Sequence, residues 1–454
     1  MNKTLCVVSC PADTFSGYGA RSRDILKSLF KLKGEEWDIK IASQRWGITP
    51  YGALDADNPE DKQILDNILT TNQLPKQPEI WVQITVPNEF QPIGKYNIGI
   101  TAGIETTICD PSWIEGCNRM NEIWVSSNHS KEVFESSKFE KRDKNTGQPI
   151  GVIELQKPVK VLFEGAKTDV YKPIKSSEIK SIDLNGIKES FCFLYLGHWL
   201  QGDLGQDRKN TGMLIKVFLE TFKNKAKQPA LILKTSMATS SIMDREEILK
   251  RIDAIRKTVK GKLPNIYLLH GNLSDTEVNE LYNHSKVKAM VNLTKGEGFG
   301  RPLLEFSLTK KPVITTGWSG HTDFLTPEFS ILLPGRLEQV HASAAQANMI
   351  LQESQWFNVD YVAAGNALVD VFTNYKKWDE KATRQAYYSR TNFSFEKMTE
   401  LIGEYVDAFE STIPKPVALQ LPKLQLPKLK KVGEENKTPG LPKLQLPKLK
   451  KVEA

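Results

Sequence analysis

The sequence predicts an α/β protein built from two doubly wound domains, and two observations lead to this fold class. Short apolar runs alternate with helical patterns in two series, from Thr4 to Glu164 and from Phe191 to Thr316. Strands that alternate with helices pair as a parallel sheet. Between the series, Tyr171 to Glu189 contains Pro173 and a pair of serines, which is typical of an interdomain linker. Two facing halves of this kind would enclose a cleft.

The first series begins with Thr4 to Cys10, a β-branched and apolar run that predicts a buried strand. A glycine loop, Phe15 to Ala20, follows, and Ile25 and Leu29 then recur on one face of a predicted helix. Glu105 falls just past the carboxyl end of a later strand, where open α/β sheets place ligands; the alternative is a solvated loop residue. The other elements expected in this series are strands at Lys40 to Ser43, Glu79 to Val86, Tyr96 to Ile100, Glu122 to Ser126 and Val159 to Glu164, and a hairpin tip at Lys141 to Gln148.

The second series repeats this pattern. Its expected strands are Phe191 to Leu196, Ala230 to Thr235, Asn265 to His270, Val287 to Leu293 and Pro312 to Thr316. Its expected helices lie near Met213 to Phe222, Arg245 to Val259, Asp275 to Asn283 and Arg301 to Thr309. After about Thr391, the segment FSFEKMTELIGEYVDAF has the spacing of one more amphipathic helix.

The most informative stretch, TKGEGFGRPLLEF, follows the strand predicted at Val287 to Leu293. Its glycines at 296, 298 and 300 allow the backbone to turn and to approach a ligand closely. Pro302 suits the first turn of a helix because it has no N–H to leave unpaired, so we expect a helix over Arg301 to Thr309. The free amides of that helix would face the glycine turn, which is an anion-binding geometry.

Two glutamates frame this turn: Glu297 lies in the loop, and Glu305 lies on the helix, four residues after Arg301. Carboxylates beside such a helix start are poor phosphate ligands but good acceptors for hydroxyl groups. The pair therefore suits a ligand with hydroxyls at both ends and phosphate between them, as in a nucleotide sugar. The alternative is a solvated Glu297 and a surface Glu305 that pairs with Arg301 at i, i+4.

Composition excludes several classes of protein. The chain has 454 residues, of which 40% are apolar, which suits about two to three domains with sizeable cores. Its five cysteines include no CxxC pair, which argues against a disulfide framework and a zinc site. We expect a soluble, cytoplasmic protein, because the sequence has no signal peptide and no apolar run of about 18 residues. Asp55 and Asp57 form a DxD pair, but no apolar strand precedes them to position a divalent ion.

The positive charge of the chain belongs to its C-terminal tail. Residues 411–454 contain ten Lys and three Glu, a balance of +7, which equals the net charge of the whole chain. The remainder is neutral, so the basic pI is no sign of a nucleic-acid surface. Within the tail, LPKLQLPKLKKV occurs at Leu421 to Val432 and again at Leu441 to Val452. Because its regularly spaced prolines prevent a stable helix, we expect a disordered tether at 411–454, or a weak contact of 421–452 with a partner or an anionic surface.

The stretch GEGFGRPLLE, together with VLFEGAKTDVYKP at Val161 to Pro173, resembles the retaining group 1 glycosyltransferases of the GT-B fold. In that family an E-x7-E motif lies in the second domain, and Glu297 and Glu305 match it in spacing and context. The resemblance covers most of Leu5 to Phe409 and is specific in the glycine-rich stretch.

This resemblance implies two Rossmann-like domains that face each other across a cleft. Residues 1–172 would form the acceptor-side domain, completed by a crossing helix at about 393–410. Residues 173–392 would form the domain that binds the nucleotide-sugar donor. The tail at 411–454 matches nothing in the family.

The family also implies roles for individual residues in the second domain. Glu297 would contact the donor sugar and Glu305 the ribose hydroxyls. The backbone amides of Phe299 and Gly300 would lie near the sugar and the phosphate.

A basic pair would bind the diphosphate in this family. Lys209, in DRKNTG, matches the Lys of the family's RKG turn. His198 stands where the family has the Arg of a GR pair, so either Arg208 substitutes for that residue or the phosphate is held differently.

In the first domain, many family members have a His after the strand that corresponds to Tyr96 to Ile100. Here GIETT supplies Glu105, for which the resemblance suggests a base or orienting role. The loop with Gly17 and Gly19 matches the family's N-terminal glycine loop near the acceptor side and completes the predicted set of binding residues.

The implied activity is transfer of a sugar, with retention, from a UDP- or GDP-linked donor to an unidentified acceptor. No cofactor and no metal ion would be needed, because a helix dipole, Lys209 and Arg208 would stabilise the diphosphate leaving group. Two other classes of function stay open. One is an enzyme of the same fold, such as a sugar-nucleotide epimerase or a phosphorylase, and the other is a non-catalytic nucleotide-sugar-binding module whose tail recruits partners.

Overall fold

The computed structural model describes residues 3–413, apart from 72, 75, 144, 200 and 238. The two copies of the tail repeat lie outside these residues, as does nearly all of the predicted tail at 411–454. The predictions about a tether or a partner contact therefore stay predictions.

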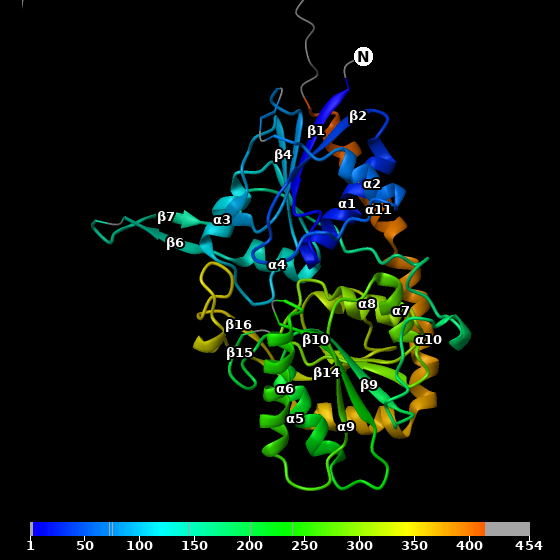
Figure 1. Cartoon of the computed structure of the whole chain (residues 1–454). Coiled ribbons are helices and arrows are strands. Elements are labelled where there is room, and N and C mark those ends of the chain that lie inside the picture. Colours follow the sequence, from blue (N-terminus) through cyan, green and yellow to red (C-terminus); the bar gives the residue numbers. More distant parts are fainter. Residues whose placement is uncertain are drawn as a thin grey trace, which may run out of the picture. The chain divides into compact units, whose positions relative to one another are not determined.

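The first domain is a parallel sheet of six strands with helices on both faces (Figure 1). Its elements are β1 (Thr4–Cys10), α1 (Gly17–Lys33), β2 (Trp37–Ser43), α2 (Pro59–Asp66), β3 (Ile80–Ile84), η1 (Pro87–Glu89), β4 (Tyr96–Thr101), α3 (Pro111–Asn118), β5 (Glu122–Val125), α4 (Asn128–Ser136) and β8 (Val159–Val161). The strand order is β2-β1-β3-β4-β5-β8. A chain that starts in the middle of a sheet and winds to both sides is doubly wound.

The second domain repeats this architecture. Its elements are η2 (Ser176–Glu178), β9 (Cys192–His198), α5 (Thr211–Phe222), β10 (Ala230–Ser236), α6 (Ile242–Lys257), β11 (Ile266–Leu269), α7 (Asp275–Asn283), β12 (Val287–Val291), α8 (Arg301–Ser307), β13 (Val313–Thr316), η3 (Gly320–Asp323), β14 (Ile331–Leu333) and α9 (Tyr361–Thr373). The strand order is β11-β10-β9-β12-β13-β14, and neighbouring strands are again parallel. The predicted fold class is confirmed.

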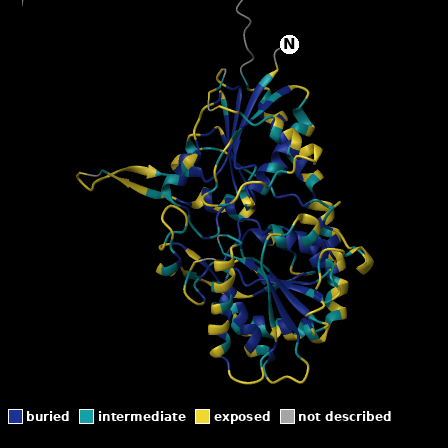
Figure 2. Cartoon of the chain, viewed as in Figure 1, coloured by how far each residue is buried: buried dark blue, intermediate teal, exposed yellow. Residues whose placement is uncertain are grey.

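The period of two along β1 gives the first domain a core on each face of its sheet. Cys6 and Val8 are buried in a cluster with α1 and with α11 (Phe395–Glu410). Leu5 and Val7 point to the opposite face, into a cluster with α3 and α4. Strands buried on both faces are characteristic of parallel sheets, and Figure 2 shows both sheets as largely buried.

The second sheet is covered in the same way. Phe193 and Tyr195 of β9 pack in a cluster with α5, α6 and α9. Cys192 and Leu194 face the other side, where α7 and α8 lie. β9 therefore packs against a hydrophobic core on each face of the second sheet. This packing fixes the position of its carboxyl end, where the next loop begins.

The C-terminal helices connect the two domains. After α10 (Tyr375–Asn392), α11 lies beside α1 of the first domain (Figure 1). Met398 and Ile402 are buried in the first core, and the hydroxyl oxygens of Ser28 and Thr399 are 2.8 Å apart. The last described helix is therefore part of the first domain's packing.

Two antiparallel hairpins are added to the sheets. One, β6 (Phe139–Arg142) with β7 (Pro149–Ile153), projects from the first domain and is largely exposed (Figures 1 and 2). Its tip is the turn predicted at Lys141 to Gln148. The other, β15 (Gly335–Gln339) with β16 (Gln355–Val359), follows β14 and was not predicted.

All five cysteines are buried and none is in a disulfide. Burial raises the pKa of Cys10 and Cys109 to about 12, so these thiols stay protonated. No helix within residues 3–413 has the length and apolar character needed to cross a membrane.

Candidate functional site

The candidate site lies at the carboxyl ends of β9 and β12, the two central strands of the second sheet. This is where open α/β sheets bind ligands. The chain leaves β12 at Val291 and turns through residues 292–300 before α8 begins. Gly300 has a left-handed backbone, with φ of 95°, which favours glycine, and Pro302 follows in the first turn of α8. α8 ends at Ser307, two residues before the predicted end.

Two glycines of this turn bring the second domain into contact with the first. A Cβ atom on Gly296 would lie 2.0 Å from the backbone oxygen of Glu105, and one on Gly298 would lie 2.3 Å from that of Ala102. No side chain fits at either position. The glycines predicted to approach a ligand therefore also allow the loop after β4 to lie directly against the candidate site.

The loop after β9 supplies the two cations of the site. Asn210 has a left-handed backbone, with φ of 54°, and its N–H donates to the Asp207 carbonyl. The Asp207 carboxylate also accepts from the N–H of Thr211, the first residue of α5. This turn directs Arg208 and Lys209 toward the loop after β12.

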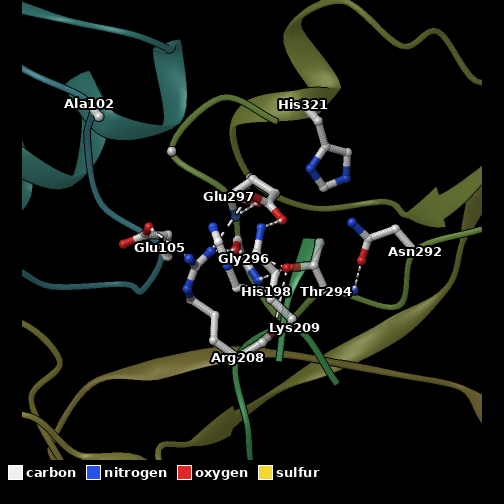
Figure 3. Close-up of polar contacts among 12 residues, drawn as sticks. Ala102, Glu105, His198, Arg208, Lys209, Asn292, Thr294, Gly296, Glu297 and His321 are labelled. Carbon is white, nitrogen blue, oxygen red and sulfur yellow. Dashed lines mark hydrogen bonds and ion pairs between the residues drawn. The ribbon is translucent and has the colours of Figure 1, made fainter. Parts of the chain in front are cut away.

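Glu297 lies between these two cations (Figure 3). Its carboxylate is 2.5 Å from Lys209 Nζ and 3.6 Å from a terminal nitrogen of Arg208. The same Arg208 nitrogen donates to the Gly296 carbonyl at 2.9 Å. The side chains of Glu297, Arg208 and Lys209 are 8%, 15% and 14% exposed, so the three charges interact in a largely dehydrated setting.

The charge state of Glu297 follows from these contacts. Burial favours the protonated form, but Lys209 and Arg208 outweigh it and lower the pKa of Glu297 to about 2. The Glu297 N–H donates to the Ser319 hydroxyl at 2.9 Å, which fixes the backbone next to the carboxylate. Glu297 is thus a rigid, ionised acceptor at neutral pH.

Glu105 reaches the same cluster from the first domain. Its carboxylate lies 3.5 Å from Arg208 and its side chain is 31% exposed. Arg208 therefore contacts carboxylates from both domains, and Figure 3 shows Glu105 on the side of the cluster opposite His321. The residue predicted from the first domain is at the candidate site.

Glu305 lies in a different cluster of charges, one turn into α8. Arg301 Nε is 2.8 Å from its carboxylate, as expected at i, i+4. Another nitrogen of Arg301 is 2.5 Å from the carboxylate of Asp24 on α1. The surface alternative for Glu305 is wrong, because its side chain is only 8% exposed and its partner bridges to the other domain.

The pKa of Glu305 shifts upward. Burial raises it, Arg301 only partly offsets that effect, and the resulting pKa is about 7. A carboxyl group in this state can accept a hydrogen bond when ionised and donate one when protonated.

The remaining predicted residues lie at different places. His198 ends β9, is exposed, and has its Nδ1 within 3.1 Å of the Ser236 hydroxyl and 3.0 Å of the Met237 carbonyl oxygen. Gly17 and His198 line one cavity of about 360 Å³ between the domains.

Gly19 is buried, and a Cβ atom at this position would lie 2.2 Å from the Thr14 carbonyl oxygen, so Gly19 allows the start of α1 to pack closely. The Phe299 side chain is 3% exposed and belongs to the core.

One residue near the site was not predicted. His321 in η3 is fully buried, and its Nε2 lies 2.6 Å from the Thr316 carbonyl oxygen. Its Nδ1 has no hydrogen-bond partner, and its ring stands on the Glu297 side of the site (Figure 3). The only sequence signal was its place in a second glycine turn, GWSGH, directly after a predicted strand.

Within the described part of the chain, no group of three or more His, Cys, Asp or Glu side chains is arranged to hold a metal ion. Asp55 and Asp57 lie before α2, and the Asp55 carboxylate accepts from the Asp57 N–H at 2.9 Å, as in an ordinary turn. The predicted metal independence remains a prediction.

No protein-family model matches the sequence, and no curated protein is recognisably similar to it. Solved structures are similar in fold. They include a sucrose-phosphate synthase from Thermosynechococcus elongatus (TM-score 0.60, 10% identity, 90% of this chain and 100% of that chain). They also include a glycosyltransferase from Rickettsia africae (0.58, 13%, 90% and 99%) and HepE of Anabaena in complex with UDP-glucose (0.57, 14%, 89% and 99%). At these identities the similarity shows a common fold, that of two-domain glycosyltransferases.

Proposed function

We propose that the protein is a glycosyltransferase that moves a sugar from a nucleotide-diphosphate sugar to an acceptor. The observation that carries the proposal is the buried cluster in which Glu297 lies between Arg208 and Lys209. This cluster combines a fixed acceptor for sugar hydroxyls with two cations for a diphosphate. It occupies the ligand edge of a sheet in a fold shared with a structure solved with UDP-glucose.

The cations would act on the leaving group. As the bond from the sugar to the diphosphate breaks, negative charge grows on the β-phosphate oxygens. Arg208 and Lys209 are already fixed by Glu297 and by backbone contacts, so little reorganisation is needed when that charge develops. This arrangement supports the proposal that no metal ion and no other cofactor takes part.

The carboxylates would hold the hydroxyl groups of the donor. Glu297, ionised at neutral pH, would accept from the transferred sugar, and Glu305 would accept from the ribose. The E-x7-E resemblance supports this assignment and, with it, transfer with retention of configuration. UDP- and GDP-linked sugars are the donor classes to test.

The Glu105 carboxylate would compete with the donor's diphosphate for Arg208. It is the more exposed of the two acids that contact Arg208 and comes from the other domain. A diphosphate that binds Arg208 would displace it, and Glu105 would then be free to orient the acceptor or the sugar. Binding and rearrangement of the first-domain loop would thereby be coupled.

A screen of the full chain with UDP-glucose, GDP-mannose and related donors tests the proposal. Binding should raise the melting temperature, because a ligand that binds only the folded state stabilises it. Release of nucleoside diphosphate with an added acceptor should continue in EDTA, and NMR of the product should show the anomeric configuration of the donor.

Three results would contradict the proposal. Loss of activity in EDTA would exclude metal independence. Transfer that is unchanged in Glu297→Ala and Lys209→Ala would exclude this site. Conversion of the donor to another nucleotide sugar without any acceptor would instead identify an epimerase.

A further inference from the structure

A chain of hydrogen bonds runs from Lys295 through Asn358 and Tyr361 to Asn210, the residue that follows Lys209. We infer that this chain positions the cations of the proposed diphosphate site. The inference deepens the proposed function and rests on it, because it says how a cation at the leaving group is held in place. It also gives a role to the hairpin of β15 and β16, since Asn358 lies on β16.

The donors and acceptors of this chain match. Lys295 Nζ donates to Asn358 Oδ1 at 2.8 Å. The Tyr361 hydroxyl oxygen lies 3.2 Å from Asn358 Oδ1 and 3.2 Å from Asn210 Nδ2. Its single proton has Asn358 Oδ1 as the nearer acceptor, because Asn210 Oδ1 is 3.4 Å away. The hydroxyl therefore donates to Asn358 and accepts from Asn210, and the amide oxygen of Asn358 accepts both of its bonds.

Asn210 ends the chain in the turn that carries the cations. It is fully buried, precedes α5 as the N-cap residue and has a left-handed backbone, with φ of 54°. An asparagine at this position usually caps the helix with its side chain, but here the side chain forms no capping bond. The Asp207 carboxylate accepts from the Thr211 N–H in its place. The Asn210 amide is thus committed to Tyr361, and this contact holds a backbone conformation that most residues avoid.

Lys209 depends on this turn more than Arg208 does. Arg208 is also held by the Gly296 carbonyl and by two carboxylates. Lys209 directly precedes Asn210, and within the described part of the chain its ammonium group contacts Glu297 alone. A change in the Asn210 turn would therefore displace Lys209 first.

Lys295 fixes the other end of the chain. It is 1% exposed and has no ion pair with any described residue, and the carboxylates of Glu338 and Asp207 act on its charge only from beyond ion-pair distance. Its N–H donates to the Arg208 carbonyl at 2.7 Å, and its carbonyl accepts from the Phe357 N–H at 2.9 Å. Residue 295 thus joins the loops after β9 and β12 to the hairpin. A buried lysine without an ion-pair partner costs free energy, and such placements cluster at functional sites.

Calorimetric titration of the full chain with UDP and uridine, and with GDP and guanosine, tests this inference. Tyr361→Phe removes the hydroxyl and keeps the ring, so the affinity for the nucleoside diphosphate should fall by about fivefold, while that for the nucleoside stays the same. Lys295→Met should lower the diphosphate affinity by about tenfold. Tyr375→Phe is the matched control and should alter neither affinity, because its hydroxyl donates to the Lys288 carbonyl elsewhere in the second domain.

A second comparison separates positioning from a general loss of stability. In Lys209→Ala the cation that the turn positions is absent, so adding Tyr361→Phe should weaken diphosphate binding by less than about twofold. Residues that act through one network show non-additivity of this kind. A purely structural role of Tyr361 would weaken nucleoside and diphosphate alike, or would weaken the diphosphate equally with and without Lys209.

The inference is overturned if Tyr361→Phe binds the diphosphate as tightly as the wild type, if it weakens nucleoside and diphosphate alike, or if its effect persists in full in Lys209→Ala. A wild type that binds neither UDP nor GDP would contradict the proposed function and this inference together. Wild-type binding that Tyr361→Phe leaves unchanged would contradict this inference alone, so the two failures are distinguishable.

Discussion

Glu297 lies in the loop before α8 and Glu305 lies within α8. Both carboxylates are buried beside an arginine, yet their pKa values shift in opposite directions. The pKa of Glu297 falls to about 2 and that of Glu305 rises to about 7. Burial acts upward on both. The neighbouring charges differ: Glu297 has Lys209 and Arg208, whereas Glu305 has Arg301, which also pairs with Asp24, and the nearby Asp275 carboxylate raises the pKa of Glu305 further.

If the chain binds a nucleotide sugar as proposed, the two clusters would hold different parts of it. Arg208 and Lys209 outnumber Glu297, so their cluster can accept an anion once Glu105 moves away. Around Glu305, the cations Arg301 and Lys167 face the carboxylates of Asp24, Asp275 and Glu305, so that cluster offers oxygen acceptors and no excess positive charge. The first suits a diphosphate with its sugar, and the second suits ribose hydroxyls.

Removal of the shared arginine should have the largest effect. In Arg301→Met, Asp24 and Glu305 remain buried without their guanidinium partner, so we expect the free energy of unfolding to fall by about 3–5 kcal/mol in urea denaturation. Arg245→Met is the matched control, because Arg245 forms an exposed ion pair with Glu246 on α6. It should cost less than about 1 kcal/mol. Equal decreases in the free energy of unfolding of the two variants would show that the ion pairs of Arg301 stabilise the protein no more than an exposed ion pair does.

Removal of the Lys209 side chain should lower kcat. Lys209→Ala takes away a fixed cation at the proposed leaving group, so kcat should fall by about 10²–10³-fold. Lys223→Ala, which removes a surface partner of Glu220, should leave kcat unchanged. Steady-state release of nucleoside diphosphate measures both. A drop of less than threefold in Lys209→Ala would remove this residue from the mechanism.

The raised pKa of Glu305 predicts a pH dependence of donor binding. Below pH 7 the carboxyl group is mostly protonated, and above it the group is ionised and accepts from ribose hydroxyls. Affinity for a nucleotide sugar should therefore increase by up to about tenfold from pH 6 to pH 8. Calorimetry at several pH values measures this, and Glu305→Gln should remove the slope. If the affinity of Glu305→Gln for the nucleotide sugar depends on pH as strongly as that of the wild type, another titratable group causes the dependence.

Glu105 should have the smallest effect, in the opposite direction. Glu105→Gln frees Arg208 from a partly exposed ion pair, so nucleoside diphosphate should bind up to about fivefold more tightly. Glu115→Gln removes a comparable exposed pair with Lys141 and should not alter binding. Weaker binding in Glu105→Gln would mean that Glu105 supports the diphosphate site instead of competing with it.

Local signals predicted much of the fold. β1 and α7 have the bounds that were predicted for them. In the structure, α7 begins with a capping box formed by Ser274 and Glu277. α2 was missed although Asn58 caps it and Pro59 opens it, because Ile64 is the only apolar residue that this helix buries, so its segment has no apolar stripe. α10 was missed for a physical reason. It buries small and polar side chains, so the sequence shows no apolar stripe.

The candidate site was predictable where its residues follow strands. Glu297 and Lys209 are 88 positions apart, but each lies in a glycine or polar loop directly after an apolar run. The contacts between domains had no such signal. The pairing of Asp24 with Arg301, 277 positions away, depends on how the two domains pack, and neither residue stands out in its local segment.

The most direct test of the central claim is calorimetric titration of wild type and Lys209→Ala with a nucleoside diphosphate and with the corresponding nucleoside. If Arg208, Lys209 and Glu297 form the diphosphate site, the variant should lose at least about tenfold in affinity for the diphosphate and nothing for the nucleoside. Equal affinity of wild type and variant for the diphosphate would contradict the account.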